Sequence, residues 1–521
     1  MSQLLKETIS EFYQKLITEY KEHGTWLNDT YDSDKQSEQG FYGGDLGIYY
    51  TLLTLKQFHD SSVELPDITY TPHEFYTHGL THTFTEKFVL NRDIKSLIDD
   101  VYFDYSEFTF DVISGYAGSI LWAIYFSKKE NDPFYLEFAE NCATALMQTY
   151  QYEEEGVSWE WPLRRVRNIL GYSHGNTGIA HAFFELWNET GKPEYYNFAD
   201  EAWKFEDQFF NPENNNWPDF RIEEDETNVQ IDYMNTWCHG ANGIGVANIR
   251  FYELTGEQRF LDRARSAYEI QAIDGGGNIS LCHGIGGNIE FSLAMYRVLN
   301  DDVYYKDALF ALENTIKTNK ELPCFLNGVN KEHAKNSSLF LGEAGLIYAC
   351  LRVLYPDQVQ DVLYLLASGQ PKHHTKPKSS LFKEKDLKEL TDLHQTFIKY
   401  KASHKSYEDV RLTSPDNQFT SDMLIDLRNP KFKIYEDDEG DYIMYLKNNQ
   451  FALKPLSPFP KLIFSIATEK GILSKEELLL ELSKLLEDDI YSQVKETIDE
   501  QLSILYKNGF IEVLQEEVEA Q

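Results

Sequence analysis

The stretch Trp237-Cys238-His239-Gly240 is followed later in the chain by the similar stretch Leu281-Cys282-His283-Gly284. These two stretches decide how the 521-residue chain is interpreted. Both place a cysteine and a histidine directly before a glycine. Two cysteine sulfurs and one imidazole can hold a zinc ion and leave its fourth position open for chemistry. Buried cysteines also serve as small apolar residues, and no close C-x-x-C pair is present. Spacing alone therefore leaves a zinc site and structural cysteines as equal alternatives.

Six glycine pairs recur along the chain, and an apolar segment of helical length follows each of them. The pairs are Gly44/Gly47, Gly115/Gly118, Gly175/Gly178, Gly240/Gly243, Gly284/Gly287 and Gly342/Gly345. Between them lie segments that mix charged and aromatic residues, such as residues 193–210 and 258–273. Helices that are apolar all round belong inside a fold, and amphipathic helices belong outside. We therefore predict an all-α fold, a closed α/α toroid of inner and outer helices with the glycine turns gathered at one rim.

The composition is that of an acidic globular protein, because 85 acidic and 48 basic side chains give a net charge of −37. Nucleic-acid binding needs clustered cations and is not expected. Five cysteines without dense spacing favour a reducing compartment over a disulfide framework. The N-terminal segment lacks the basic flank and apolar run of a signal peptide, and no stretch reaches roughly 18 apolar residues. We expect a cytoplasmic protein without a membrane span.

Three regions are predicted along the chain. They are the toroid at residues 1–366, a basic linker with a helix at 367–428, and a small winged-helix-like α+β domain at 429–521. Between residues 370 and 406 of this linker lysines outnumber acids, which indicates either a solvated connection or a docking surface for an acidic partner. The last region begins with three short strand patterns, and Ser474 with Glu477 forms a capping box at the start of a helix.

Two further residues stand close to glycine turns of the same predicted rim. His174 is suited to exchange protons near neutral pH, although a lone histidine is more often structural. Asp111 is placed to pair with His174, although the local sequence favours a helix cap or turn residue. His239 is a further candidate ligand, and it is better explained by orienting its turn or contacting a substrate. A zinc ion lowers the pKa of a bound thiol, so such a site suits thiolate addition or alkylation.

Five blocks together resemble the lanthipeptide cyclases of the LanC type, over about residues 1–366. The blocks are DVISGYAG (111–118), GYSHGNTG (171–178), NTWCHGANG (235–243), SLCHGIGG (280–287) and FLGEAG (340–345). The resemblance implies an α/α toroid in which Cys238, Cys282 and His283 hold Zn²⁺ while His174 and Asp111 act as acid/base residues. It also implies the reaction, in which a peptide cysteine thiolate adds to dehydroalanine or dehydrobutyrine and closes a (methyl)lanthionine ring.

The resemblance implies partners as well: a dehydrated precursor peptide with leader and core, a dehydratase, and a transporter complex at the membrane. His239 and Trp237 are candidate substrate contacts. The family often has tyrosine after the first zinc cysteine and an arginine shortly before the Trp-Cys pair, whereas this chain has His239 and, near the second position, Met234. These departures concern substrate positioning and leave the metal site intact.

The C-terminal pattern of strands and helices is similar to the PqqD-like recognition elements, which bind a leader peptide as an added strand. A winged helix used for dimerisation or DNA binding is the alternative, and the acidic composition disfavours DNA. Two other functions stay open for the whole chain. One is a noncatalytic scaffold that binds peptide or glutathione. The other is a different zinc-dependent thiol alkyltransferase, although the prenyltransferase ligand set Asp-Cys-His contains a single cysteine.

Overall fold

The structure is a computed structural model, and it describes most of the first two thirds of the chain and parts of the remainder. The described residues are 2–26, 40–68, 80–99, 110–147, 149–153, 155–159, 168–221, 232–271, 277–322, 325, 336–365, 370–372, 374–377, 424–426, 432–437, 440–447, 450–455, 462–463, 466, 472–486, 490–491, 495, 498, 502 and 512–514. The chain divides into two compact units, Met1–Met147 with Glu155–Leu381, and Gln148–Glu154 with Phe382–Gln521.

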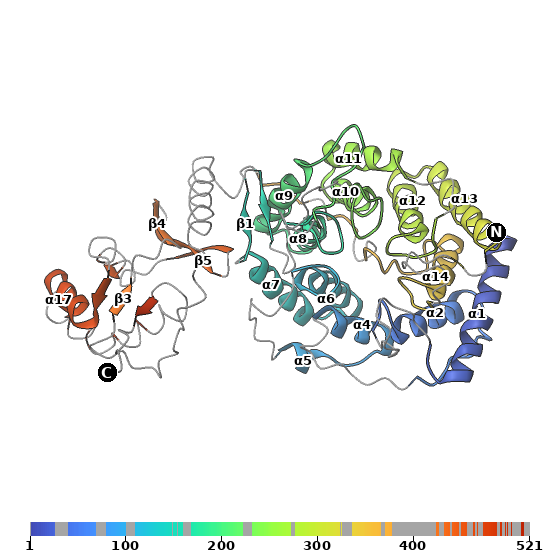
Figure 1. The fold of residues 1–521 in the computed structure, drawn as a ribbon, viewed down its shortest axis with the longest axis horizontal. Coiled ribbons are helices and arrows are strands. Elements are labelled where there is room, and N and C mark those ends of the chain that lie inside the picture. Colours follow the sequence, from blue (N-terminus) through green and yellow to red (C-terminus); the bar gives the residue numbers. More distant parts are fainter. Residues whose placement is uncertain are drawn as a thin grey trace, which may run out of the picture. The chain divides into compact units, whose positions relative to one another are not determined.

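The helices of the first unit form two concentric layers (Figure 1). The inner layer consists of α2 (Asp45–Phe58), α4 (Leu80–Leu90), α6 (Tyr116–Glu130), α8 (Asn176–Thr190), α10 (Ala241–Thr255), α12 (Ile285–Leu299) and α14 (Glu343–Leu354). The outer layer consists of α1 (Gln3–His23), α5 (Lys95–Asp99), α7 (Pro133–Met147), α9 (Pro193–Asp207), α11 (Gln258–Glu269) and α13 (Asp302–Asn319). Each inner helix contacts the next, and α14 contacts α2, so the ring closes and the predicted toroid is confirmed.

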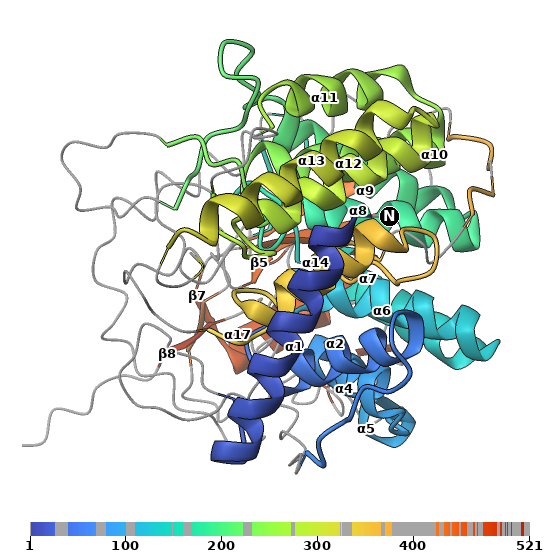
Figure 2. The ribbon, with the colours of Figure 1, turned by 90° about the vertical axis from the view of Figure 1, so that its right-hand side faces the viewer.

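Helix α1 covers the place where the two ends of the ring meet. Figure 2 shows it crossing in front of α14, and it contacts both α14 and α13. Its apolar side buries residues that include Leu5, Phe12 and Leu16. Ser2 caps the helix by accepting the Leu5 N–H, and Gly24 ends it in the left-handed conformation. The N-terminal segment therefore belongs to the fold itself.

The two layers differ in burial as their sequences predict. Helix α8 is buried continuously from Asn176 to Asn188, because it packs against neighbours on every side. Helix α11 buries only Phe260, Leu261 and two alanines, and its charged face is on the outside. A helix that is apolar all round is stable only in the inner layer, and an amphipathic helix suits the outer layer, where one face is exposed.

Glycines begin the inner helices because the preceding turns press against the first helical turn. The residue before the helix is glycine in α2, α6, α8, α10, α12 and α14. A Cβ added at Gly243 would lie 2.1 Å from the Trp237 carbonyl oxygen, so a larger residue would displace the turn. Helix α4 does not follow this sequence pattern, because His82 stands three residues after Gly79, where the second glycine of a pair would be.

Residues 355–365 turn back into the ring after α14. The Tyr348 hydroxyl of α14 donates to the Gln360 carbonyl (2.9 Å) and accepts the Val362 N–H (3.0 Å). The Tyr364 ring is 1% exposed and packs against Tyr172 with a centroid distance of 4.7 Å. The returning segment therefore supports the turn before α8 from inside the toroid.

A fully buried ion pair ties α8 to α10. Arg250 donates to both carboxylate oxygens of Glu185, at 2.5 and 3.0 Å, and both side chains are 0% exposed. Burial alone would raise the pKa of Glu185, but Arg250 and His181 hold it at about 2. His181 in turn contacts the Tyr172 hydroxyl at 2.8 Å. This network joins the interior of the ring to the turn before α8.

The second unit contains strands and a capped helix. Strands β4 (Phe432–Asp437), β5 (Gly440–Lys447) and β6 (Gln450–Pro455) form an antiparallel sheet in that order, which confirms the three predicted strands. Strands β7 (Ile472–Ser474), β3 (Leu424–Asp426) and β8 (Glu512–Leu514) form another, with β3 in the middle. Helix α17 (Lys475–Leu485) begins with the predicted capping box. Two short strands, β1 (Gln151–Tyr152) and β2 (Val157–Ser158), complete the described elements.

The start of the predicted linker is docked on the toroid. Lys372 pairs with Glu189 (2.8 Å) and Lys376 with Glu257 (3.3 Å), while His374 contacts the Asn188 carbonyl at 2.9 Å. In the described residues these lysines bind carboxylates of the same chain. The rest of the predicted linker lies almost wholly outside the described residues, as do most of the helices predicted after Pro455, and the proposed domain boundaries stay predictions.

Candidate active site

The turns before the inner helices are joined to one another by backbone hydrogen bonds along one rim of the toroid. Phe340 donates to Tyr42 (3.0 Å), Leu281 and Cys282 to Phe340 (2.8 and 3.2 Å), Cys238 to Cys282 (3.4 Å), Tyr172 and Ser173 to Cys238 (3.1 and 3.2 Å), and Val112 to Ser173 (3.0 Å). Residues from separate repeats therefore meet at this rim. The gathering of glycine turns that the sequence predicted is confirmed.

Cys238 and Cys282 lie close enough to share a hydrogen bond between their side chains. The bond from Cys282 lowers the pKa of Cys238 to about 6, against the effect of burial, with help from Thr236 and Arg221. The same bond, together with burial, raises the pKa of Cys282 well above the usual value for a thiol. The Thr236 hydroxyl stands 3.3 Å from the Cys238 sulfur. Of the two thiols, Cys238 is therefore the one whose surroundings favour a thiolate.

Asp111 and His174 form a hydrogen-bonded pair on the neighbouring turns. The Nδ1 of His174 lies 2.6 Å from Oδ2 of Asp111, and the Oδ1 of Asp111 accepts the N–H groups of Ser114 (2.8 Å) and Gly115 (2.9 Å). Asp111 therefore caps its own turn and also fixes the imidazole. The His174 side chain is 31% exposed, whereas that of Asp111 is 1% exposed. With Nδ1 turned to the carboxylate, proton exchange with a ligand falls to Nε2.

The Asp111–His174 pair and the thiol pair are neighbours. The carbonyl of Cys238 accepts the N–H groups of both Tyr172 and Ser173, directly before His174. His174 contributes to the lowered pKa of Cys238, and its ring centroid lies 6.3 Å from that of His239. The two predicted parts of the site thus belong to one cluster.

His239 is buried inside this cluster. Its Nδ1 lies 3.1 Å from the Leu170 carbonyl oxygen, and its Nε2 is buried without a hydrogen-bond partner within the described part of the chain. Burial lowers the pKa of His239 to about 3, and Arg221 adds to the effect, so the ring is neutral. A neutral imidazole with an unused nitrogen is consistent with either of its predicted roles, as turn support or as substrate contact.

Trp237 lies beneath the turn that carries Cys238. Its ring packs against Phe340 and Tyr172, with centroid distances of 5.3 and 5.8 Å. The side chain is 2% exposed and supports the turn by these contacts, while its contact with a substrate stays a prediction.

His283 is placed by its backbone, which donates to the Ser280 hydroxyl (3.1 Å) and accepts from the Asn278 side chain (3.2 Å). Among the described residues, no three His, Cys, Asp or Glu side chains are grouped closely enough to hold a metal ion. The structure thus brings the two predicted sulfur ligands together and does not assemble them with His283. The paired thiols have the donor chemistry that zinc takes, and the third ligand stays a prediction.

Arg221 also lies at the site, and the sequence analysis did not identify it. Its guanidinium makes a two-pronged ion pair with Asp219 and donates to the Met234 sulfur at 2.9 Å. Its positive charge favours the thiolate of Cys238. A guanidinium therefore does lie beside Met234, supplied by a residue 13 positions upstream. No motif marks Arg221, because a loop rather than a helix brings it to the site.

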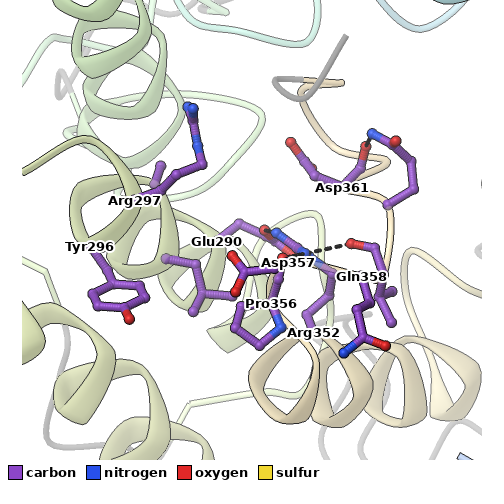
Figure 3. A pocket seen from close by; sticks show the side chains of 12 residues that line it. Glu290, Tyr296, Arg297, Arg352, Pro356, Asp357, Gln358 and Asp361 are labelled. Carbon is purple, nitrogen blue, oxygen red and sulfur yellow. Dashed lines mark hydrogen bonds and ion pairs between the residues drawn. The ribbon is translucent and has the colours of Figure 1, made fainter. Parts of the chain in front are cut away.

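A cavity of about 200 Å³ lies between α12, α14 and residues 356–361 (Figure 3). Its polar side chains bind one another. Arg352 donates to both oxygens of Glu290 (2.7 and 2.8 Å) and to the carbonyls of Pro356 and Val359. The cavity is lined by the C-terminal ends of α12 and α14, whereas the thiol pair precedes the N-termini of α10 and α12. We therefore regard its ion pair as structural.

Fold and site together define an α/α toroid whose rim joins a thiol pair to a hydrogen-bonded His–Asp pair. The chain belongs to the family described as lanthionine synthetase C-like proteins, whose model matches residues 75–364, more than half of the sequence.

The chain is also similar to individual proteins. The lacticin 481/lactococcin biosynthesis protein LcnDR2 of Lactococcus lactis subsp. lactis is 30% identical over 190 residues, which are 34% of this chain and 18% of that protein. The glutathione S-transferase LANCL1 of Danio rerio is 23% identical over 259 residues, 47% of this chain and 58% of that protein. The structure of nisin cyclase aligns with 68% of this chain and 84% of its own, at 15% identity and a TM-score of 0.40.

The chain spans only 18% and 58% of the length of these two sequence relatives. In the described residues, none of the helices has the length and apolar character that a membrane crossing requires.

Proposed function

We propose that this chain is a zinc-dependent lanthipeptide cyclase. In this proposal it adds cysteine thiolates of a dehydrated precursor peptide to dehydroalanine or dehydrobutyrine residues of the same peptide. The observation that carries the proposal is the junction at Cys238. Its side chain lies beside that of Cys282, its carbonyl accepts two N–H groups of the turn that carries His174, and His174 is bound to Asp111. Membership of the lanthionine synthetase C-like family supports the same class of chemistry.

In the proposed site Cys238, Cys282 and His283 hold the zinc ion. Bound zinc lowers the pKa of a substrate thiol and so supplies the attacking thiolate at neutral pH. Arg221 stabilises negative charge on the sulfurs of the protein, and Thr236 offers a hydroxyl to Cys238.

Metal analysis of the purified protein tests this ligand set. We expect Cys282→Ala and His283→Ala to lose zinc, while Cys142→Ala, at a buried free cysteine of α7, retains it. Zinc retained in both site variants would refute the ligand set. Zinc lost only from Cys282→Ala would reassign the third ligand.

The role of His174 follows from the electron balance of the addition. The thiolate sulfur forms a bond to the β-carbon, the double bond opens, and the electron pair becomes an enolate at the α-carbon and its carbonyl. That carbanion needs one proton to complete the thioether. His174 supplies it from Nε2, since Asp111 holds Nδ1. The proton balance closes when the imidazole regains a proton released by the substrate thiol.

Ring closure on a dehydrated model peptide, followed by mass spectrometry after alkylation of unreacted thiols, tests this role. His174→Ala should retain its metal and its thermal stability, yet slow ring closure by about 10²- to 10⁴-fold, the usual contribution of general acid–base catalysis. An unchanged rate would remove His174 from the mechanism.

A second candidate is the addition of glutathione rather than a peptide cysteine, and the relative named as a glutathione S-transferase favours testing it. The same protein is given a dehydrated peptide that lacks cysteine, together with glutathione. Formation of a glutathione adduct at a rate matching ring closure on the cysteine-containing peptide would favour this candidate.

For the second unit we propose leader binding by strand addition. The support is the sheet β7-β3-β8, in which β7 and β8 are the outer strands among the described residues. Removal of residues 429–521 should weaken binding of the leader peptide and leave ring closure on a leaderless core peptide unchanged. Equal leader affinity of the two forms would give this unit another role. A dehydratase and a transporter complex remain the proposed partners.

A further inference from the structure

The turn that carries His174 is held from outside by a buried glutamate. Glu206, near the C-terminus of α9, is 1% exposed. Its Oε1 accepts the Gly171 N–H at 2.6 Å, and its Oε2 accepts the Thr177 N–H at 3.0 Å. One carboxyl group therefore joins the two ends of the turn at whose centre His174 stands.

The position of Glu206 follows from the helical hairpin. Helix α9 runs back along α8, so the end of α9 returns to the rim where α8 begins. In two other hairpins the corresponding contact is made by the neutral amide of an asparagine. Asn235 donates to the Ile270 carbonyl after α11 (2.9 Å), and Asn319 at the end of α13 donates to the Gly277 carbonyl (3.1 Å). In the α8–α9 hairpin the contact is made by an ionisable carboxyl group, whose two oxygens accept one N–H group each.

The turn takes an acceptor from another element because the residue at its own capping position has no side chain. Asp111 stands four residues before the glycine that precedes α6, and its Oδ1 accepts two N–H groups of that turn. The matching position before α8 is Gly171, which has no side chain. Gly171 has φ +109°, and a Cβ there would lie 2.7 Å from the Cys238 carbonyl oxygen. Close packing against Cys238 thus requires glycine here and leaves the capping to Glu206.

We propose that Glu206 is a positioning residue, which holds the 171–177 turn between α9 and the Cys238 carbonyl and so sets His174 against Asp111 beside the thiol pair. The proposal rests on the proposed function only for its catalytic consequence. The clamp itself concerns only the position of the 171–177 turn, whatever reaction the site performs. Loss of one acceptor would let the turn, and with it the imidazole, leave the position that Asp111 fixes.

The first test does not depend on activity. Hydrogen–deuterium exchange in the peptide covering 169–178 and the carbethoxylation rate of His174 by diethyl pyrocarbonate are measured in the full chain. The variants are Glu206→Gln, which keeps the size and one acceptor oxygen, and Glu206→Ala. Glu201→Gln is the matched control, because Glu201 is also a buried glutamate of α9 but binds Lys204.

We expect exchange in 169–178 and modification of His174 to be faster by on the order of tenfold or more in both Glu206 variants. The control and the other rim turns should stay unchanged. Unchanged exchange at 169–178, or an equal rise at every rim turn, would overturn the clamp.

The second test measures ring closure. Glu206→Gln should lower kcat by about tenfold with KM within about twofold, and it should add no further loss in a His174→Ala background. A lowered kcat that is independent of His174 would overturn the positioning role. If the unaltered protein closes no rings, the proposed function fails, and exchange and His174 modification still decide the clamp.

Discussion

Replacing Asp111 by asparagine should separate catalysis from folding at the candidate site. An asparagine oxygen can still accept the N–H groups of Ser114 and Gly115, which Oδ1 of Asp111 now accepts at 2.8 and 2.9 Å. The amide nitrogen, however, would face His174 Nδ1 as a donor where a carboxylate acceptor stood at 2.6 Å. The imidazole would then lose its charge-assisted bond and be held as the opposite tautomer.

The magnitude follows from the bond that is lost. A hydrogen bond to a charged group contributes about 1.5–3 kcal/mol. At about 1.4 kcal/mol for each factor of ten in rate, single-turnover ring closure should slow by about 10- to 150-fold. The thermal unfolding midpoint should stay within a few degrees of the parent protein, because the turn remains capped. Asp111→Ala, which removes the cap as well, should lose both activity and stability.

A dehydrated peptide with one cysteine is the suitable substrate, with unreacted thiol counted by alkylation and mass spectrometry. Ring closure by Asp111→Asn at the parental rate would refute the reasoning. A variant that is slow but also broadly unfolded would return Asp111 to the role of a helix cap, which the local sequence favoured.

Three further predictions concern the scaffold. Arg250→Met should lower the free energy of unfolding by about 3–5 kcal/mol in urea titrations, because it leaves Glu185 buried without its cation, and the double variant with Glu185→Gln should recover part of the loss. Gly243→Ala should cost about 1–3 kcal/mol in the same titration, since its Cβ would lie 2.1 Å from the Trp237 carbonyl oxygen. Burial raises the pKa of Glu206 to about 8, above the usual 4.5, so its folded form keeps a proton that the unfolded chain has lost. Stability from this group is therefore full below about pH 4.5 and is lost as the pH rises to about 8, and Glu206→Gln should flatten this slope of up to about 1.4 kcal/mol per pH unit.

Controls for these three predictions come from the same chain. Gly277→Ala meets nothing within 4 Å and should be neutral, so equal losses at Gly243 and Gly277 would contradict the packing argument. Arg263→Met at a partly exposed pair should cost less than Arg250→Met. Parallel curves of stability against pH for Glu206→Gln and the parent would contradict the assignment of that proton.

Most of the ring was predictable because its helices carry strong local signals. An apolar segment after a glycine pair predicts an inner helix, since packing on all sides and close approach of the preceding turn both restrict the sequence. The prediction failed at α4, where His82 replaces the second glycine, so the pattern that identified the other inner helices was absent. Residues 355–365 were missed for another reason. Their burial depends on Tyr172 and Tyr348, which lie far away in the sequence.

The site was predictable only in part. Residues that stand beside the repeated glycine turns could be identified from the sequence, and residues from other elements could not. Cys238, Cys282, His174 and Asp111 stand at repeated positions beside glycine turns, so their meeting follows from the repeat. Arg221 and Glu206 come from a loop and an outer helix, where nothing repeats. Their contacts are made only after the hairpins have packed.

The toroid explains how one site is built from residues that the sequence keeps far apart. The turns before α6, α8, α10, α12 and α14 each donate at least one backbone N–H group to a carbonyl of another turn, and the turn before α2 accepts one, so displacement of one turn breaks bonds to the next. Cys238 links two of these turns through its backbone. Its carbonyl accepts two N–H groups of the His174 turn, and its N–H donates to the Cys282 carbonyl. The distance between acid/base pair and thiol pair is therefore set by closure of the ring rather than by any single loop. A substitution that loosens a helix contact on the far side of the ring should therefore change the distance between the two pairs through this row of hydrogen bonds. The change should be larger the further the substitution separates the rim turns.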